Sequence, residues 1–135
     1  PGALTDEERR VIQRHPVVGE QILRPLPVFT DVLGIVRWHH ERVDGRGYPD
    51  GLVGTAIPWL ARIVAVADVF DALTSHRPYR SGMALEQAMA IIRRDAGSAL
   101  DVQVVAALET LAARGTLLVP AHVPPPVEPE VEVPA

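Results

Sequence analysis

The feature that most constrains the fold is an apolar stretch at residues 59–75, WLARIVAVADVFDALTS, in a chain of 135 residues. Wound as a helix, this sequence places hydrophobic side chains on nearly every side, and such a pattern is typical of a buried helix. Pro58 directly precedes the stretch and suits the first turn of a helix. We therefore predict a central helix that is buried among the other elements.

A segment rich in glycine and proline, residues 43–58, lies immediately before this helix and excludes an extended helix there. Long loops inside compact domains are usually functional or disordered. Because Tyr48 and Leu52 provide an aromatic and an apolar anchor within the segment, we predict a structured loop with a functional role.

The N-terminal region shows the start and stop signals of helices. Thr5 is suited to cap a first helix, and Glu8, three residues later, completes the pattern of a capping box. Pro16 is unfavourable in the interior of a helix, so we predict a break or restart near His15.

Apolar residues at helical spacing continue on both sides of the loop. The further helices that they predict are one ending near Arg24, one of about a dozen residues reaching His39 or His40, one around residues 85–92, and one from Val102 that stops at Gly115. We therefore predict an all-α domain over residues 1–118. Residues 119–135 are rich in proline and predict an extended linker or free terminus, which we expect to be disordered.

The composition excludes several classes of site. The chain has no cysteine, and all of its 13 basic residues are arginine. A thiolate zinc site, a thiol nucleophile and a catalytic lysine are thereby excluded, so any metal must be held by histidine and carboxylate. The lack of cysteine also suits a cytoplasmic protein.

The charge and hydropathy patterns exclude others. The net charge is −4, and without the three glutamates of the tail the remaining chain carries about −1. A nearly neutral body argues against nucleic-acid binding and against binding at a membrane surface. No stretch reaches the roughly 20 apolar residues that a membrane span needs.

Asp68 is the first candidate for chemistry, because it lies among apolar residues of the predicted central helix. A buried carboxylate must be paired, protonated or bound to a cation. One interpretation is a buried ion pair with Arg62 or another arginine, and the other is a metal ligand. Asp71 follows one helical turn later, and we interpret it as a structural hydrogen-bonding residue rather than a ligand.

A His-His-Glu run, His39 to Glu41, ends a predicted helix just before the loop. Adjacent helical residues point about 100° apart, so the two imidazoles are not expected to reach one metal in the usual way. They can face two neighbouring metals, or one metal and one substrate. The alternative for any single histidine is an ordinary core or surface residue, and His15 is by itself a weak indication.

Arg77 and Arg80 flank Pro78-Tyr79 just after the central helix. Two arginines and an aromatic ring on a short loop can clamp a phosphate and stack a base. A solvated helix end that interacts favourably with the helix dipole explains the same residues equally well.

The run from His39 to Arg80, HHERVDGRGYPDGLVGTAIPWLARIVAVADVFDALTSHRPYR, closely resembles the HD-GYP domain family. Gly47-Tyr48-Pro49 matches the tripeptide for which that family is named. Further matches are PGALTDEE at residues 1–8, HPVVGEQIL from His15, and RDAG followed by LD near residues 94–101. The resemblance implies an all-helical, HD-type bundle that acts as a metal-dependent phosphodiesterase and hydrolyses the bacterial second messenger cyclic di-GMP.

The resemblance also implies roles for individual residues. The positions that match metal ligands are His15, His39, His40 and Asp68. Those that match the substrate pocket are Gly47, Tyr48, Pro49, Arg77 and Arg80, and those expected to support the ligands are Glu41, Asp44 and Asp71. Members use two or three divalent ions, iron or manganese among them, and a metal-bound hydroxide opens the substrate to pGpG and, in some members, GMP.

One departure from the family pattern concerns its His-Asp pair, which precedes the PGALTDEE segment in the family and is not in this chain. We therefore expect the chain to be the C-terminal part of a longer HD-GYP domain, with N-terminal helices and a sensory or receiver domain upstream. Two functions stay open: hydrolysis of cyclic di-GMP that requires the N-terminal helices with the His-Asp pair, or a catalytically incomplete module that binds a nucleotide or a protein partner. Dimerisation also stays open.

Overall fold

The computed structural model describes residues 5–76 and 81–117. Within these ranges the chain forms six α-helices: α1 (Asp6–Ile12), α2 (His15–Leu23), α3 (Leu33–Trp38), α4 (Trp59–Thr74), α5 (Leu85–Asp95) and α6 (Val102–Ala113). Two short 3-10 helices, η1 (Pro27–Val32) and η2 (Gly54–Ala56), and two isolated β-bridges complete the regular structure of the described residues. The all-α prediction is confirmed.

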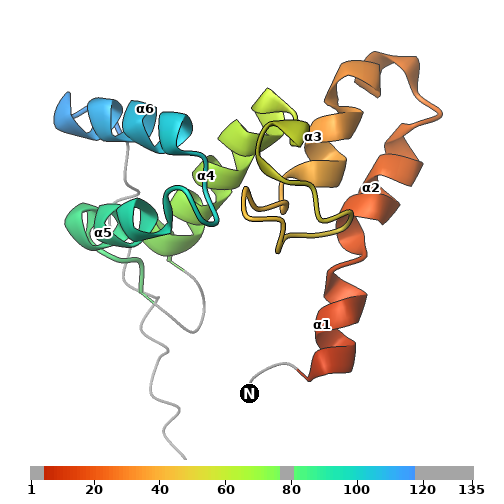
Figure 1. Cartoon of the computed structure of the whole chain (residues 1–135), viewed down its shortest axis with the longest axis horizontal. Helices are drawn as coiled ribbons and strands as arrows, with labels where there is room; N and C mark the ends of the chain where they lie inside the picture. Colours follow the sequence, from red (N-terminus) through yellow and green to blue (C-terminus); the bar gives the residue numbers. More distant parts are fainter. Residues whose placement is uncertain (1–4, 77–80, 118–135) are drawn as a thin grey trace, which may run out of the picture.

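α4 occupies the middle of the molecule, between two groups of helices (Figure 1). α2 and α3 pack together on one side of it, and α5 and α6 lie on the other. Of these, α3, α5 and α6 contact α4. α1 extends away from the rest, and none of its residues is buried.

The predicted start of the first helix and the predicted break after it are both confirmed. The Thr5 hydroxyl accepts the Glu8 N–H at 3.2 Å, and the Glu8 carboxylate accepts the Thr5 N–H at 2.8 Å, which forms a capping box. α1 ends at Ile12, and α2 restarts with Pro16 in its first turn, where the missing N–H of proline breaks no helical hydrogen bond. His15 is thereby the first residue of α2.

The predicted dozen-residue helix before the loop is too long. η1 occupies Pro27–Val32, and only six residues, Leu33–Trp38, form α3. The Thr30 hydroxyl donates to the Pro27 carbonyl at 2.8 Å within this 3-10 helix. The segment just before α3 is therefore 3-10 rather than α-helical. As a result α3 ends at Trp38, and His39 and His40 follow its last residue.

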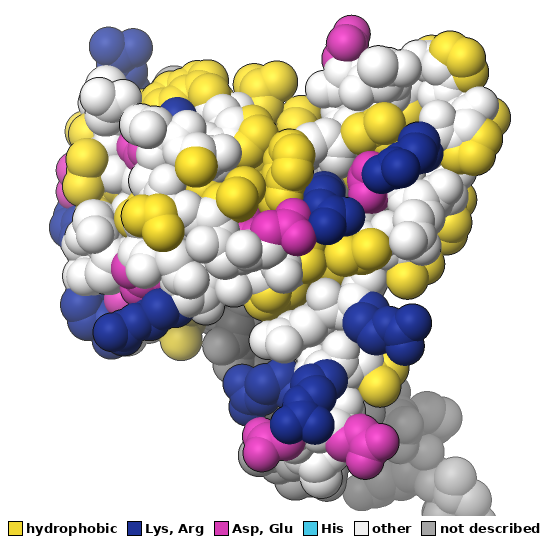
Figure 2. All heavy atoms as spheres, turned by 45° about the vertical axis from the view of Figure 1, so that its right-hand side comes forward, with side chains coloured by type: hydrophobic (Ala, Val, Ile, Leu, Met, Phe, Trp, Pro, Cys, Tyr) yellow, Lys and Arg dark blue, Asp and Glu magenta, His cyan; other side chains and the backbone are white. Residues whose placement is uncertain are grey.

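The prediction that α4 is buried on nearly every side is wrong. Only Ala61, Val66 and Thr74 are buried in this helix, whereas Trp59 and Leu60 are 44% and 53% exposed. The reason is that the described neighbours α3, α5 and α6 cover only part of its circumference. Figure 2 accordingly shows hydrophobic side chains spread over the face that it draws, with arginines and acidic residues scattered between them.

The hydrophobic core lies between α4, α5 and α6. Its buried members are Val66, Ile92, Leu100, Val104 and Val105, all aliphatic. In the described part of the chain, no helix combines the length and the apolar character that crossing a bilayer requires.

A nearly buried ion pair joins α4 to the start of α6. The Arg62 guanidinium donates to Asp101 at 2.6 Å, and Asp101 also caps α6 by accepting the N–H of Gln103 and of Val104. The interpretation in which Arg62 neutralises Asp68 is therefore wrong, because Arg62 is paired with Asp101.

Candidate metal centre

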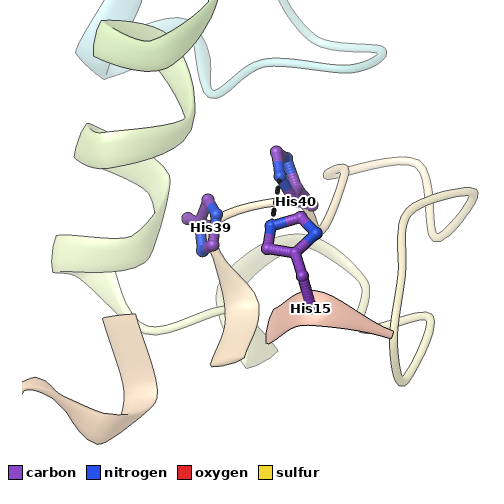
Figure 3. A group of neighbouring side chains, drawn as sticks. All are labelled: His15, His39 and His40. Carbon is purple, nitrogen blue, oxygen red and sulfur yellow. Dashed lines mark hydrogen bonds between the residues drawn. The ribbon is translucent and has the colours of Figure 1, made fainter. Parts of the chain in front are cut away.

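Three imidazole rings gather where the start of α2 meets the end of α3 (Figure 3). His15 comes from the first turn of α2, while His39 caps α3 and His40 lies in the turn after it. The ring centroids are 4.1 Å apart for His39 and His40, 4.9 Å for His15 and His40, and 5.7 Å for His15 and His39. One ring nitrogen from each lies within 4.8 Å of the other two.

Two of these rings are oriented by backbone carbonyls. His15 donates its Nδ1–H to the Ile12 carbonyl at 2.8 Å, and His39 donates its Nδ1–H to the Val36 carbonyl at 2.9 Å. Because a carbonyl can only accept, Nδ1 carries the proton in both neutral rings and Nε2 keeps the lone pair, which on His15 accepts a hydrogen bond from Nε2 of His40. This is the arrangement that metal-binding histidines usually have.

The spacing of the nitrogens suits a shared cation. The Nε2 atoms of His15 and His40 are 3.2 Å apart. Two nitrogens bound to one metal at about 2.0–2.1 Å, with a tetrahedral or octahedral angle between them, lie about 2.8–3.4 Å apart. The donor set and its geometry therefore fit a divalent metal ion.

The electrostatic environment keeps His40 neutral near pH 7. Burial lowers the pKa of His40 to about 4, and positive charge on His39 and His15 acts in the same direction, while Asp68 opposes both. A neutral imidazole has the lone pair that a metal needs, so no proton competes for this ring at neutral pH.

The expectation that His39 and His40 cannot share one cation is not met by the geometry. Their rings are 4.1 Å apart and inclined by only 41° to each other. The 100° rotation between neighbours applies inside a helix, whereas α3 ends at Trp38 and His40 lies in the turn beyond the cap. Both rings therefore face the same side.

Asp68 lines the same site from α4. It lines a cavity of about 190 Å³ together with His39 and His40, and its charge acts on His40. Our expectation that it is buried is wrong, because this side chain is on an exposed part of α4. It falls outside the group of three nitrogens within 4.8 Å, so its role as a ligand stays a prediction.

The predicted loop is folded back against the end of α3. A Cβ at Gly47 would lie 2.5 Å from Cα of Glu41, so only glycine fits this close approach. The Tyr48 ring lies over His40 with centroids 4.9 Å apart and an inclination of 32°, and a cis peptide joins it to the half-buried Pro49. Tyr48 thus packs against one of the three imidazoles.

The three carboxylates expected to support the ligands bond to other groups. Glu41 accepts backbone N–H groups of the loop, and Asp44 accepts the Arg42 guanidinium and the Arg46 N–H. Asp71 accepts the Ser75 hydroxyl at 2.7 Å, which agrees with our interpretation of it as a structural hydrogen-bonding residue. That any of them supports a metal ligand stays a prediction.

Two predicted substrate residues, Arg77 and Arg80, lie outside the described residues. Sequence reasoning overlooked Arg42 and Asp95, whose side chains line the cavity beside His39 and His40. Both positions carried a signal, since Arg42 directly follows the His-His-Glu run and Asp95 belongs to the RDAG motif.

A polar bridge also escaped the sequence analysis. Arg37 donates to Glu20 on α2 at 3.0 Å and, through two nitrogens, to Asp50 in the loop at 2.7 and 2.9 Å. Trp38 donates its indole N–H to the same Asp50 carboxylate at 2.7 Å. Through Arg37, the helix that carries His15 is tied to the loop that follows His40.

Comparison with known proteins agrees with this geometry. A sequence model of the HD domain family matches residues 1–104. The chain belongs to the HD domain family. Relatives that are named as cyclic di-GMP phosphodiesterases match the chain, which confirms the HD-GYP resemblance.

Three relatives illustrate the match. The cyclic di-GMP phosphodiesterase response regulator RpfG of Xanthomonas campestris is 49% identical over 110 residues, which cover 80% of this chain and 29% of that protein. The 3′3′-cGAMP-specific phosphodiesterase 3 of Vibrio cholerae is 41% identical, over 81% of this chain and 24% of the relative. A cyclic di-GMP phosphodiesterase of Thermotoga maritima is 42% identical, over 79% and 30%. The HD domain described here thus spans less than a third of these curated relatives.

Proposed function

We propose that this HD domain is the metal-binding part of a phosphodiesterase that hydrolyses cyclic di-GMP. The observation that carries the proposal is the convergence of three imidazoles. One ring nitrogen of each lies within 4.8 Å of the other two, and backbone carbonyls orient the rings of His15 and His39 through Nδ1. The names of the relatives support a cyclic dinucleotide as substrate. Because some of them are named for 3′3′-cGAMP, the choice of cyclic di-GMP is the finer part of the proposal.

His15, His39 and His40 would hold the cation, and Asp68 would supply a carboxylate oxygen from α4. A divalent ion such as iron or manganese supplies Lewis-acid chemistry when it is bound, activating water and neutralising charge on a phosphate. A complete centre with two or three ions needs more ligands than these four residues offer.

One residue that lines the cavity, Arg42, suits an anionic substrate. Arg42 contributes a guanidinium that is held in place by Asp44, and such a group stabilises the charge that develops on a phosphoryl oxygen. Tyr48 offers a flat ring beside His40. In the proposed reaction a water oxygen bonds to phosphorus, the bond to the 3′ oxygen breaks, and that oxygen takes up a proton, which leaves linear pGpG.

The direct test is to incubate a protein that combines this HD domain with the family's His-Asp pair with Mn²⁺ and cyclic di-GMP, and to separate the products by ion-exchange chromatography. We expect metal-dependent formation of pGpG, and we expect it to be abolished in His40→Ala and Asp68→Ala. Glu109→Gln serves as the matched control, since Glu109 pairs with Arg93 at the surface and should leave turnover unchanged.

Other outcomes discriminate between the two functions. Saturable binding of cyclic di-GMP without turnover would favour a nucleotide-binding module. If the chain neither binds nor hydrolyses cyclic di-GMP in the presence of Mn²⁺, the proposal is wrong for this chain.

A further inference from the structure

Glu41 is a buried carboxylate directly after the histidine pair. It is 3% exposed, and its two oxygens accept three consecutive backbone N–H groups of the loop: Oε1 accepts those of Asp50 and Gly51 at 2.7 and 3.0 Å, and Oε2 accepts that of Leu52 at 3.0 Å. A buried carboxylate without such partners would be costly. These bonds therefore fix residues 50–52 of the loop to the residue next to His40.

Residues 47 and 48 of the loop are fixed to the backbone of the same segment, residues 40 and 41. Gly47 packs against the backbone of Glu41 at a distance that leaves no room for a Cβ. The Tyr48 N–H donates to the His40 carbonyl at 3.2 Å. Because the loop is held at residues 47–48 and at residues 50–52, the Tyr48 ring is restricted to one region, where it lies against the His40 ring.

His40 is oriented differently from the other two histidines. His15 and His39 each have Nδ1 bonded to a carbonyl one helical turn away. For His40, the contacts seen in the described part of the chain are with the other imidazoles and with Tyr48. Metal-binding histidines usually owe their ring orientation to a partner outside the metal site, and for His40 the Tyr48 ring is in that position.

We propose that Glu41 is a positioning residue for His40, which it orients through the loop and the Tyr48 ring rather than by touching a metal or its ligands. The inference rests on the proposed metal centre for its functional meaning. Its structural half, the dependence of the Tyr48–His40 contact on Glu41, can be tested without any metal. The competing explanation is that Glu41 only stabilises the fold.

The test compares Glu41→Gln with Asp101→Asn. Glutamine keeps one oxygen but places an N–H₂ group opposite backbone N–H donors, so at least one of the three hydrogen bonds is lost. Asp101 is a matched control: it is also a largely buried carboxylate that accepts backbone N–H groups, but it caps α6 and belongs neither to the loop nor to the histidine cluster.

The first readout is the nuclear Overhauser effect between the ring protons of Tyr48 and His40 in the metal-free chain. We expect it in the wild type and in Asp101→Asn, and we expect its loss in Glu41→Gln. An undiminished effect in a folded Glu41→Gln variant would overturn the proposal whether or not the chain binds metal.

The second readout is Mn²⁺ affinity, measured by isothermal titration calorimetry. We expect Glu41→Gln to weaken binding about 10-fold or more, within the range that outer partners of metal ligands usually show. Asp101→Asn should lower the melting temperature without this loss. Equal Mn²⁺ affinity in wild type and Glu41→Gln would contradict the proposal, whereas no Mn²⁺ binding by the wild type would contradict the proposed metal centre itself.

If Glu41→Gln does not fold, Tyr48→Leu tests the same pathway, since it removes the ring but keeps all three hydrogen bonds of Glu41. We expect Tyr48→Leu to fold and to lose Mn²⁺ affinity by a similar factor. An unchanged affinity would exclude Tyr48 as the link between Glu41 and His40.

Discussion

The two halves of the molecule are held together by different interactions. Around α5 and α6 the buried residues are hydrophobic, and four of them form one cluster with Val66 of α4. Around α2, α3 and the loop, the buried side chains include two carboxylates, Glu20 and Glu41, and hydrogen bonds and ion pairs are among the contacts that join the elements. The histidines lie in this polar half.

The difference has a physical consequence. Aliphatic burial contributes most to stability and has no preferred direction, whereas hydrogen bonds are directional and contribute less net free energy. The polar half can therefore hold imidazoles in a defined arrangement, while the aliphatic half provides the stable base. We expect the polar half to open more readily than the aliphatic half.

The largest effect should come from the aliphatic half. Ile92 is fully buried in the core cluster, so Ile92→Ala leaves a cavity and should lower the free energy of unfolding by about 2–5 kcal/mol, against about 0.5–1.5 kcal/mol for Ile92→Val. Urea denaturation followed by circular dichroism measures both. If both variants lose the same free energy of unfolding, the packing of Ile92 in the core does not determine the stability.

A smaller loss is expected in the polar half. Arg37→Leu removes the bridge between Glu20 and Asp50 and leaves each carboxylate with one partner fewer, which should cost about 1–3 kcal/mol. Arg93→Leu is the matched control, because Arg93 forms a surface pair with Glu109, and its loss should change stability by no more than about 0.5 kcal/mol. Indistinguishable denaturation curves for the two variants would show that the Arg37 bridge does not stabilise the fold.

Hydrogen exchange compares the two halves directly. The amides of Asp50, Gly51 and Leu52, which are bonded to the Glu41 carboxylate, should exchange at least about 10-fold faster than the buried amides of α5 and α6. Exchange-detected NMR at neutral pH gives both sets of rates in one experiment. The comparison breaks down if the loop amides prove as well protected as the core.

The smallest expected effect is on the stability of the fold at low pH. The hydrogen bond from Arg42 holds the pKa of Asp44 at about 2, below its ordinary value of 3.8. Because the folded pKa is the lower one, the stabilising contribution is present above pH 4 and is lost as the pH falls towards 2. The free energy of unfolding of Asp44→Asn should therefore fall less steeply over this range than that of the wild type. Parallel curves would show that the pair contributes nothing.

Local signals in the sequence were sufficient for much of the fold. The capping box at Thr5, the restart at Pro16 and the stop at Gly115 depend on residues within a few positions of one another, and all three appear in the structure. The glycines and prolines before α4 likewise excluded a helix by their own backbone geometry.

The errors arose where distant residues decide the outcome. Asp68 looked buried because its sequence neighbours are apolar, but burial depends on which helices cover α4. The partner of Arg62 is Asp101, which lies 39 residues away. The three loop N–H groups that bond to the Glu41 carboxylate were likewise not predicted, because only the folded chain brings them to it.

The central claim is that three imidazoles bind one cation through nitrogens that the backbone leaves free. The most direct measurement is the proton NMR spectrum of the chain loaded with Co²⁺, in which the N–H protons of coordinated imidazoles are shifted far outside the usual range. The account predicts shifted, exchangeable N–H signals from His15 and His39, one lost in His15→Ala and another in His39→Ala, since both rings keep Nδ1–H bonded to a carbonyl. A spectrum without shifted N–H signals, or one that is unchanged in both variants, would contradict it.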